Sequence, residues 1–203
     1  MDALAGSVWF STLDLKSGYW QVEVQEEHKE RTAFTVGPLG FWECNSMPYG
    51  LTNAPATFQR LMEQCMGDLH LQKCLIYIDD IVVFSKTLDE HVKRLSEVFA
   101  RLQSCGLKLK PSKCDFLKKS VRYLGHIISA DGVQTDPDKI EAIQNWKVPQ
   151  TTDDVRRFLG FVGFYRRFIK NYASIARPLT NLLVGDPKSG RRKNRKKKTY
   201  SCT

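Results

Sequence analysis

Two adjacent carboxylates, Asp79 and Asp80, stand between two short apolar segments of the sequence. Residues 74–78 and 81–84 are rich in β-branched side chains, so they predict two strands joined by a two-residue turn that holds both acids. Acids in hairpin turns are common, and taken alone the pair indicates no function. The aliphatic flanks, however, predict a hairpin inside a sheet, where two adjacent negative charges are unfavourable without a counter-ion.

Divalent cations would neutralise such a pair. Carboxylate oxygens suit Mg²⁺, and two such ions about 3.5–4 Å apart stabilise the attacking and leaving oxygens of a phosphoryl transfer. A third carboxylate on a neighbouring strand would complete the site. Asp14 suits this role, because residues 8–15 predict a strand that carries it, followed by a turn that contains Gly18. The sequence therefore predicts a magnesium site at Asp14, Asp79 and Asp80, with Mn²⁺ as an alternative ion.

The elements around these acids predict an α+β fold. One helix is expected to begin after Asn53, and another after Thr87, whose capping box uses Glu90 and whose end is marked by Gly106. The order strand, helix, hairpin, helix, strand describes an antiparallel sheet with helices on one face. Further strands are predicted at residues 21–24, 32–36 and 121–129.

Residues 131–184 are predicted to be mainly helical. One helix is expected to begin near Thr151 and to run to Ile169. On that helix Arg156 and Arg167 would lie about 20° out of alignment and about 16 Å apart along the axis. Such a basic edge could contact successive phosphates of a nucleic acid, and a solvated charged face is the alternative.

The net charge of +9 is concentrated in a basic tail. Residues 186–203 contain eight Lys or Arg and one Asp, which leaves the preceding residues near +2. Residues 185–203 are predicted to be disordered, because they have almost nothing apolar to bury. The tail is interpreted as a nuclear import signal or as a region of non-specific contact with polyanions. Read-through of unrelated sequence is the alternative.

The remaining composition excludes several classes of protein. No run of about 18 apolar residues is present, so no membrane partner is expected, and the first residues lack a secretory signal. The six cysteines include no C-x-x-C pair, so reduced intracellular thiols are predicted and a zinc site is not. The expected location is the cytoplasm, or the nucleus through the basic tail.

Five motifs occur in series and together resemble the reverse transcriptases of gypsy-like LTR retrotransposons and their retroviral relatives. They are FSTLDLKSGYWQ (10–21), MPYGLTNAPATFQ (47–59), YIDDIVVFS (77–85), YLGH (123–126) and FLGFVGFYRRFI (158–169). The resemblance covers about residues 2–184. It implies a right-hand polymerase, with the palm and part of the fingers in residues 1–130 and the start of the thumb or connection in residues 131–184.

The resemblance also implies roles for single residues. Asp14, Asp79 and Asp80 would bind the two catalytic metal ions. Tyr19 would be the steric gate that lies under the incoming sugar and excludes a ribose 2′-hydroxyl. The other implied contacts are those to the nucleotide and template at Pro48, Tyr49 and Gly50, and the primer grip at Leu124, Gly125 and His126.

The activity implied is RNA-directed DNA polymerisation. The implied partners are an RNA or DNA template–primer duplex and deoxynucleoside triphosphates, while the sequence does not specify an oligomeric state. Two departures from the family pattern matter: the pattern is already under way at Asp2, and the chain after Val184 has no room for a ribonuclease H domain. Two classes of function therefore remain. The chain is a polymerase domain of a Pol protein, or it is a truncated or host-retained remnant that at most binds nucleic acid.

Overall fold

The structure, a computed structural model, describes residues 2–184, so the predicted disordered tail lies outside the described residues. The chain forms two compact units, Met1–Asp136 and Pro137–Thr203. The first unit contains the sheets, and the described part of the second is helical. None of the described helices is both long enough and apolar enough to cross a bilayer.

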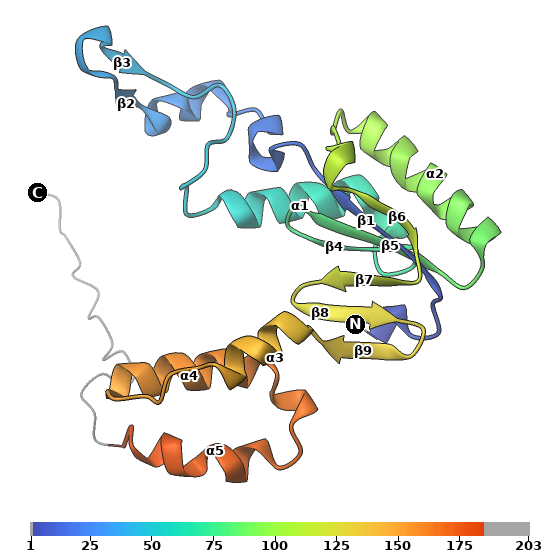
Figure 1. The fold of residues 1–203 in the computed structure, drawn as a ribbon. Coiled ribbons are helices and arrows are strands. Elements are labelled where there is room, and N and C mark those ends of the chain that lie inside the picture. The colour runs from blue at the N-terminus through green and yellow to red at the C-terminus, as the bar shows by residue number, and fades with distance from the viewer. Residues whose placement is uncertain (1, 185–203) are drawn as a thin grey trace, which may run out of the picture. The chain divides into compact units, whose positions relative to one another are not determined.

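The first unit is built on a four-stranded antiparallel sheet (Figure 1). Its central strands are β1 (Trp9–Asp14) and β5 (Asp80–Ser85), which pair from Trp9 opposite Ser85 to Asp14 opposite Asp80. The outer strands are β4 (Cys74–Tyr77), which pairs with β5, and β6 (Asp115–Lys118), which pairs with β1. The predicted hairpin therefore has its second strand in the sheet interior.

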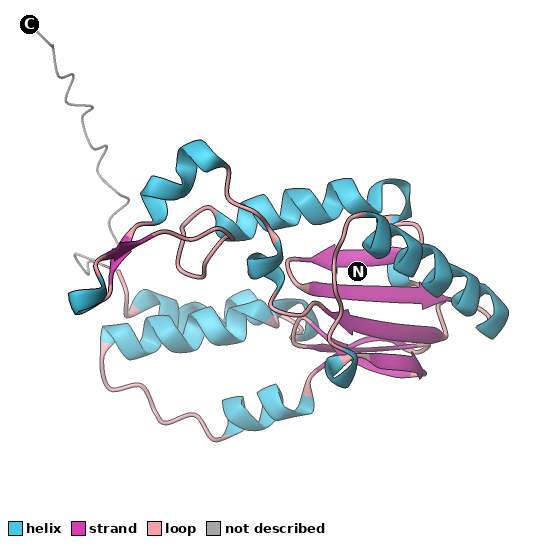
Figure 2. Ribbon diagram, turned by 90° about the horizontal axis from the view of Figure 1, so that it is seen from above, coloured by secondary structure: helices cyan, strands magenta, loops and turns pink. Residues whose placement is uncertain are grey.

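Two helices cover one face of this sheet (Figure 2). They are α1 (Ala54–Met66) and α2 (Leu88–Ser104). As predicted, the Thr87 side chain accepts a hydrogen bond from the Glu90 N–H at the start of α2. At the other end of α2, Gly106 adopts a φ of 70°, a conformation that glycine tolerates without a steric penalty.

The opposite face of the sheet packs on a second antiparallel sheet. This sheet has the order β7 (Ser120–Tyr123), β8 (His126–Ser129) and β9 (Gly132–Thr135). Side chains alternate along β5, because successive residues of a strand point to opposite faces. Ile81 and Val83 join the cluster with α1 and α2, whereas Val82 and Phe84 join the cluster with β7 and β8. The strand β9 lies within residues 131–184, so the prediction of a mainly helical segment there is wrong for its first residues.

A smaller arm of the first unit projects from the main sheet (Figure 1). It contains the 3₁₀ helices η2 (Gly18–Gln21) and η3 (Glu26–Thr32) and the paired strands β2 (Phe34–Thr35) and β3 (Phe41–Trp42). The predicted strand at residues 21–24 is wrong, since this segment makes only an isolated bridge between Glu23 and Ser46. In this segment Val22 and Val24 alternate with polar residues and pack against the core. An extended chain can place them there without the regular hydrogen bonds of a β-sheet.

The second unit contains α3 (Pro137–Gln144), α4 (Thr152–Phe164) and α5 (Tyr172–Asn181). A capping box between Thr151 and Asp154 begins α4, as its sequence predicts. The prediction that this helix continues to Ile169 is wrong. Its last turn tightens into i→i−3 hydrogen bonds, and a separate 3₁₀ helix, η7 (Arg166–Phe168), follows.

A disulfide joins Cys65 near the end of α1 to Cys105 at the end of α2, with 6.1 Å between their Cα atoms. The prediction of reduced thiols is therefore wrong for these two cysteines. They lie 40 residues apart in the sequence and in no motif, so only the side-by-side packing of the two helices brings them together. Cys44, Cys74 and Cys114 are free.

Removal of this cross-link is expected to lower the stability of the first unit. Closing a loop of this size stabilises a protein by about 4 kcal/mol in the chain-entropy model. Treatment with a reductant should therefore lower the melting temperature of the wild-type chain, and a Cys105→Ser variant should melt at that lower temperature in either condition. Cys114→Ser is the matched control and should keep the response to reductant. Free thiols at both Cys65 and Cys105 in the purified oxidised protein would contradict this prediction.

Candidate active site

The three predicted acids meet at one end of the two central strands. Asp14 is the last residue of β1 and lies opposite Asp80, the first residue of β5. Asp79 lies in the turn immediately before Asp80. The prediction that both acids occupy the turn is wrong by one residue, because Tyr77 pairs with Asp80 and the turn consists of Ile78 and Asp79. The hydrogen-bond register thus fixes Asp80 in the sheet and leaves Asp79 at its edge.

The turn has an unfavourable backbone conformation that α1 supports. Ile78 has a φ of 54°, which is rare for a β-branched residue and is found mainly where surrounding structure enforces it. Its N–H donates to the Gln59 side-chain oxygen at 2.7 Å, and the Gln59 amide in turn donates to Glu63 at 2.7 Å. Gln59 is the last residue of the motif at 47–59, but no local pattern assigns it this role. It positions the turn that carries Asp79.

Asp79 is partly buried. Its Oδ1 atom is buried and has no hydrogen-bond partner among the described residues. Burial raises the pKa of Asp79, and the neighbouring charges of Asp14 and Asp80 raise it further, while Lys113 opposes the shift. Burial also raises the pKa of Asp80, with Asp14 adding to the shift. The three carboxylates therefore share one electrostatic environment that disfavours their combined charge.

Gly18 provides the space that Asp79 occupies. A Cβ atom added to Gly18 would overlap Oδ1 of Asp79 and would lie 3.0 Å from Cζ of Phe58. The requirement for glycine is steric, since its φ does not lie in the left-handed region. From the sequence, Gly18 is expected only in a turn, and this contact is not predicted.

The structure adds a cation, Lys113, to the predicted site. It ends the short helix η6 (Pro111–Lys113), and its Nζ lies 3.4 Å from Oδ2 of Asp14. Three carboxylates with a buried, unpaired oxygen have the donor chemistry that divalent ions prefer. Within residues 2–184, however, no three His, Cys, Asp or Glu side chains are arranged so that they could hold one ion together. The donors are thus adjacent without forming a finished coordination site.

Aromatic side chains lie beside Asp79. The Tyr19 ring centroid lies 5.2 Å from that of Tyr49 and 5.3 Å from that of Phe58. Burial raises the pKa of the Tyr19 phenol, and the charge of Asp79 adds to the shift. Tyr19 and Tyr49, both predicted to contact the nucleotide, are therefore brought together next to the acids. Pro48 and Gly50 flank Tyr49 in the same loop.

Two of the predicted primer-grip residues, Leu124 and Gly125, form the turn between β7 and β8, and the third, His126, begins β8. Leu124 and Gly125 both have positive φ, 48° and 73°, as a two-residue hairpin turn of type I′ requires. His126 is buried, and its Nδ1 lies 2.9 Å from the Leu124 carbonyl oxygen, which braces the turn. A small cavity of about 130 Å³ has among its lining residues Asp14, Asp80, Lys113, Tyr123 and Leu124. The turn and the acids therefore border the same space.

The two predicted basic residues of the second unit do not form one helical edge. Arg156 lies on α4 and donates to Asp153 at 2.8 Å. Arg167 lies on η7, after α4 has ended, and its guanidinium stacks on Phe168 at 5.1 Å. The predicted alignment of Arg156 with Arg167 is therefore wrong, because the helix that carries Arg156 ends before Arg167. Contact of either residue with nucleic acid stays a prediction.

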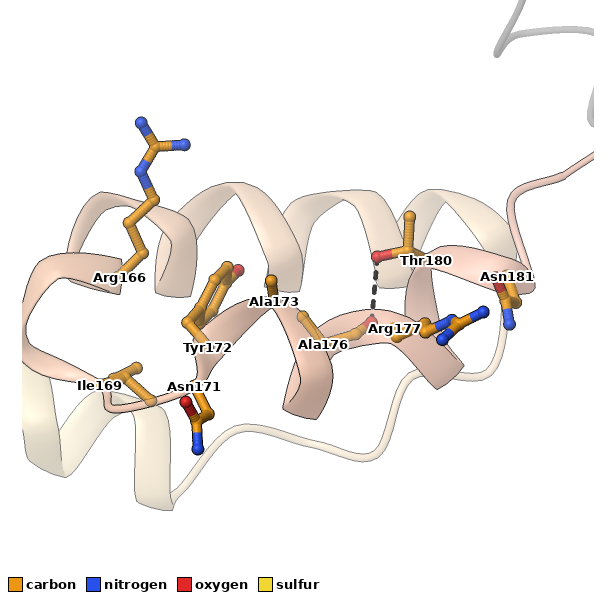
Figure 3. A pocket seen from close by; sticks show the side chains of 9 residues that line it. All are labelled: Arg166, Ile169, Asn171, Tyr172, Ala173, Ala176, Arg177, Thr180 and Asn181. Carbon is orange, nitrogen blue, oxygen red and sulfur yellow. Dashed lines mark hydrogen bonds between the residues drawn. The ribbon is translucent and has the colours of Figure 1, made fainter.

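The second unit also contains an open pocket of about 640 Å³ along α5 (Figure 3). Ala173, Ala176 and Thr180 follow one side of α5, with Arg166 at one end of the pocket and Arg177 at the other (Figure 3). Thr180 donates its hydroxyl hydrogen to the Ala176 carbonyl oxygen at 3.0 Å. The described residues that line this pocket include no carboxylate, so it offers no second candidate for metal-dependent chemistry.

Comparison with known proteins identifies the family. Residues 1–128 match the model of the family described as reverse transcriptase (RNA-dependent DNA polymerase). The retrovirus-related Pol polyproteins from transposons 297 and gypsy of Drosophila melanogaster are 44% and 40% identical to this chain, over 90% of its length. The chain spans only 18% of each of these relatives.

Solved structures agree with this result. The foamy viral protease–reverse transcriptase dRH in complex with double-stranded DNA matches with a TM-score of 0.81 and 29% identity, over 87% of this chain and 31% of that one. The foamy viral protease–reverse transcriptase in complex with an RNA/DNA hybrid matches with a TM-score of 0.76 over 87% of this chain and 24% of that one. These matches confirm the predicted α+β polymerase palm. The chain belongs to the reverse transcriptase family and corresponds to the reverse transcriptase domain of gypsy-like retrotransposon Pol polyproteins.

Proposed function

We propose that this chain extends a primer 3′-hydroxyl on an RNA or DNA template, with Asp14, Asp79 and Asp80 as ligands of two divalent metal ions. The observation that carries this proposal is the buried and unpaired Oδ1 of Asp79, next to two further carboxylates. Like charges in a partly desolvated site are unfavourable unless a cation neutralises them. Mg²⁺ ions, when bound, supply activation of the attacking oxygen and stabilisation of the leaving pyrophosphate.

The protein's own residues would align the reactants. The backbone of Asp80 is fixed by its pairing with Tyr77 and Asp14. The position from which its carboxylate extends is therefore defined. Asp79 is held by the Gln59-supported turn and by contact with Gly18. Such fixed placement accounts for a large part of catalysis in reactions that depend on positioning.

The partners proposed are a template–primer duplex and deoxynucleoside triphosphates. Support for the duplex comes from the foamy viral enzyme, whose solved complexes contain double-stranded DNA or an RNA/DNA hybrid. Support for the nucleotide comes from Tyr19 and Tyr49, whose rings lie together beside the acids. Base pairing with the template would select the nucleotide, so the protein needs to recognise only the shape of the pair.

Primer extension on an RNA template with Mg²⁺ tests the proposal. The wild-type chain and Asp115→Asn are expected to extend the primer, whereas Asp79→Asn is not. Asp115 is a matched control, because it lies on β6 of the same sheet and its carboxylate is exposed. Equal extension by wild type and Asp79→Asn would contradict the assignment of the site. Duplex binding without extension by any of the three chains would instead support the alternative, an inactive remnant that only binds nucleic acid.

A second prediction concerns the sugar of the incoming nucleotide. Replacement of Tyr19 by Val removes the ring that packs on Phe58 beside Asp79. Discrimination against ribonucleotides is expected to fall by about 10- to 200-fold, the range that the shape of a pocket usually provides. The ratio of incorporation efficiencies for dATP and ATP measures this effect. Tyr19→Phe keeps the ring and should keep the ratio, and a ratio that is unchanged in Tyr19→Val would contradict the assignment.

A further inference from the structure

We propose that Lys113 acts as a cationic gate of the acidic site: its ammonium group holds Asp14 in the metal-free protein and must leave before a divalent ion can bind there. This inference rests on the proposed function, because it concerns the same three carboxylates. It goes further in assigning to Lys113 control over the affinity of the site for metal ions.

The first observation is the position of the ammonium group. Lys113 Nζ lies 3.4 Å from Oδ2 of Asp14. The charge of Lys113 also acts on Asp79 and Asp80, where it opposes the effect of the neighbouring carboxylates. One lysine therefore contacts Asp14 and acts electrostatically on the other two acids.

The second observation is the anchoring of Lys113 to the strand that carries Asp14. The N–H of Lys110 donates to the Asp14 carbonyl oxygen at 2.9 Å, and the Asp14 N–H donates to Sγ of Cys114 at 3.5 Å. Pro111 begins the short helix between these two contacts and restricts its backbone. Residues on both sides of Lys113 are thus bonded to Asp14, Lys110 through its main chain and Cys114 through its side chain, so the lysine is held within reach of the acids.

The third observation is the exposure of the lysine to solvent. Its side chain is 56% exposed and that of Asp14 is 27% exposed, so water can replace each partner around the other. Exposed ion pairs contribute little to stability. Arg122, the other cation that lines the adjoining cavity, lies 3.8 Å from Asp136 and so has a carboxylate of its own.

An ammonium group and a divalent ion cannot occupy the same side of one carboxylate. They repel each other, and each needs the oxygen lone pairs that the other uses. The contact between Lys113 and Asp14 therefore occupies a carboxylate oxygen that a divalent ion would use. Binding of a divalent ion would require release of the lysine toward solvent.

The test is the affinity of the chain for Mn²⁺ in the absence of nucleic acid, measured from the free-ion signal in electron paramagnetic resonance. Lys113→Gln is expected to bind Mn²⁺ about three- to tenfold more tightly than wild type, since a competing charge is lost. Lys113→Arg keeps the charge and should remain close to wild type. The matched control is Lys118→Gln, which removes the same charge from β6, where Lys118 lies 3.6 Å from Asp115.

The outcomes separate this inference from the proposed function. Equal affinities in Lys113→Gln and Lys118→Gln, with binding still abolished by Asp79→Asn, would overturn the gate and leave the metal site intact. Mn²⁺ binding that Asp79→Asn does not change would contradict the proposed function itself. Absence of binding in both wild type and Lys113→Gln would contradict both.

Discussion

A Gly18→Ala variant is expected to lose about 100-fold in the rate of primer extension while it remains folded. The added methyl group would overlap Oδ1 of Asp79, so the carboxylate must move from its position beside Asp14 and Asp80. A displacement of about 1 Å in a reacting group can cost about 100-fold in rate. The rate should be measured in single turnover with saturating nucleotide, so that the chemical step is observed.

The expected cost in stability is small by comparison. Overpacking of a buried position usually costs about 1–3 kcal/mol, which should appear as a modest fall in melting temperature. Gly160→Ala is a suitable control, because outside its own helical turn none of the described residues lies within 4 Å of a Cβ atom added there. Wild-type extension by Gly18→Ala would mean that Asp79 does not act from the position that the structure gives it.

An Asp79→Asn variant is expected to show opposite changes in activity and stability. Extension should fall by more than about 100-fold. Loss of a residue that only hydrogen-bonds to a metal ligand already lowers the activity or metal affinity of such sites by about 10- to 100-fold, and Asp79 is proposed to be a ligand itself. In metal-free buffer at neutral pH, however, the variant should melt at a higher temperature than wild type. The reason is that an amide removes one of three mutually repelling charges from a partly buried site.

The pH dependence of this stability difference follows from the pKa of Asp79, which is raised in the folded chain. A raised pKa means that the ionised carboxylate is disfavoured in the folded state relative to the unfolded state. The destabilisation is therefore complete above the folded-state pKa and disappears as the pH falls below the unfolded value of about 3.9. The melting temperatures of wild type and Asp79→Asn should differ most at neutral pH and converge toward pH 4.

Excess Mg²⁺ provides the control for this second prediction. Bound cations should stabilise wild type and not the variant, which would reduce or reverse the difference in melting temperature. A wild-type chain that is more stable than Asp79→Asn in metal-free buffer at pH 7 would contradict the conclusion that the ionised Asp79 carboxylate is disfavoured in the folded chain.

Local sequence patterns were sufficient to predict the framework of the site. The aliphatic segments on both sides of the acids predicted a hairpin in a sheet, and β5 indeed lies between β4 and β1. The strand that ends at Asp14 was also predicted, and its pairing with Asp80 explains how residues far apart in the sequence reach one site. The capping residues Thr87 and Thr151 marked the starts of their helices, because capping depends on neighbours within one turn.

The features that were missed depend on contacts between distant segments. No local pattern indicates that Gln59 supports the Ile78 turn, or that Gly18 must leave room for Asp79. The pairing of Cys65 with Cys105 likewise arises from the packing of two helices. The predicted continuous helix to Ile169 failed because periodicity in apolar residues persists through the short 3₁₀ segment that follows α4. The five ordered motifs identified the family without revealing any of these contacts.

The most direct measurement is anomalous X-ray diffraction from crystals of the chain with template–primer, a deoxynucleoside triphosphate and Mn²⁺. Two anomalous peaks about 3.5–4 Å apart are expected, both in contact with carboxylate oxygens of Asp14, Asp79 or Asp80. The Lys113 ammonium should then lie away from Asp14. Peaks that contact other residues, or a bound nucleotide with no peak at these three carboxylates, would contradict the conclusion that they form the catalytic centre.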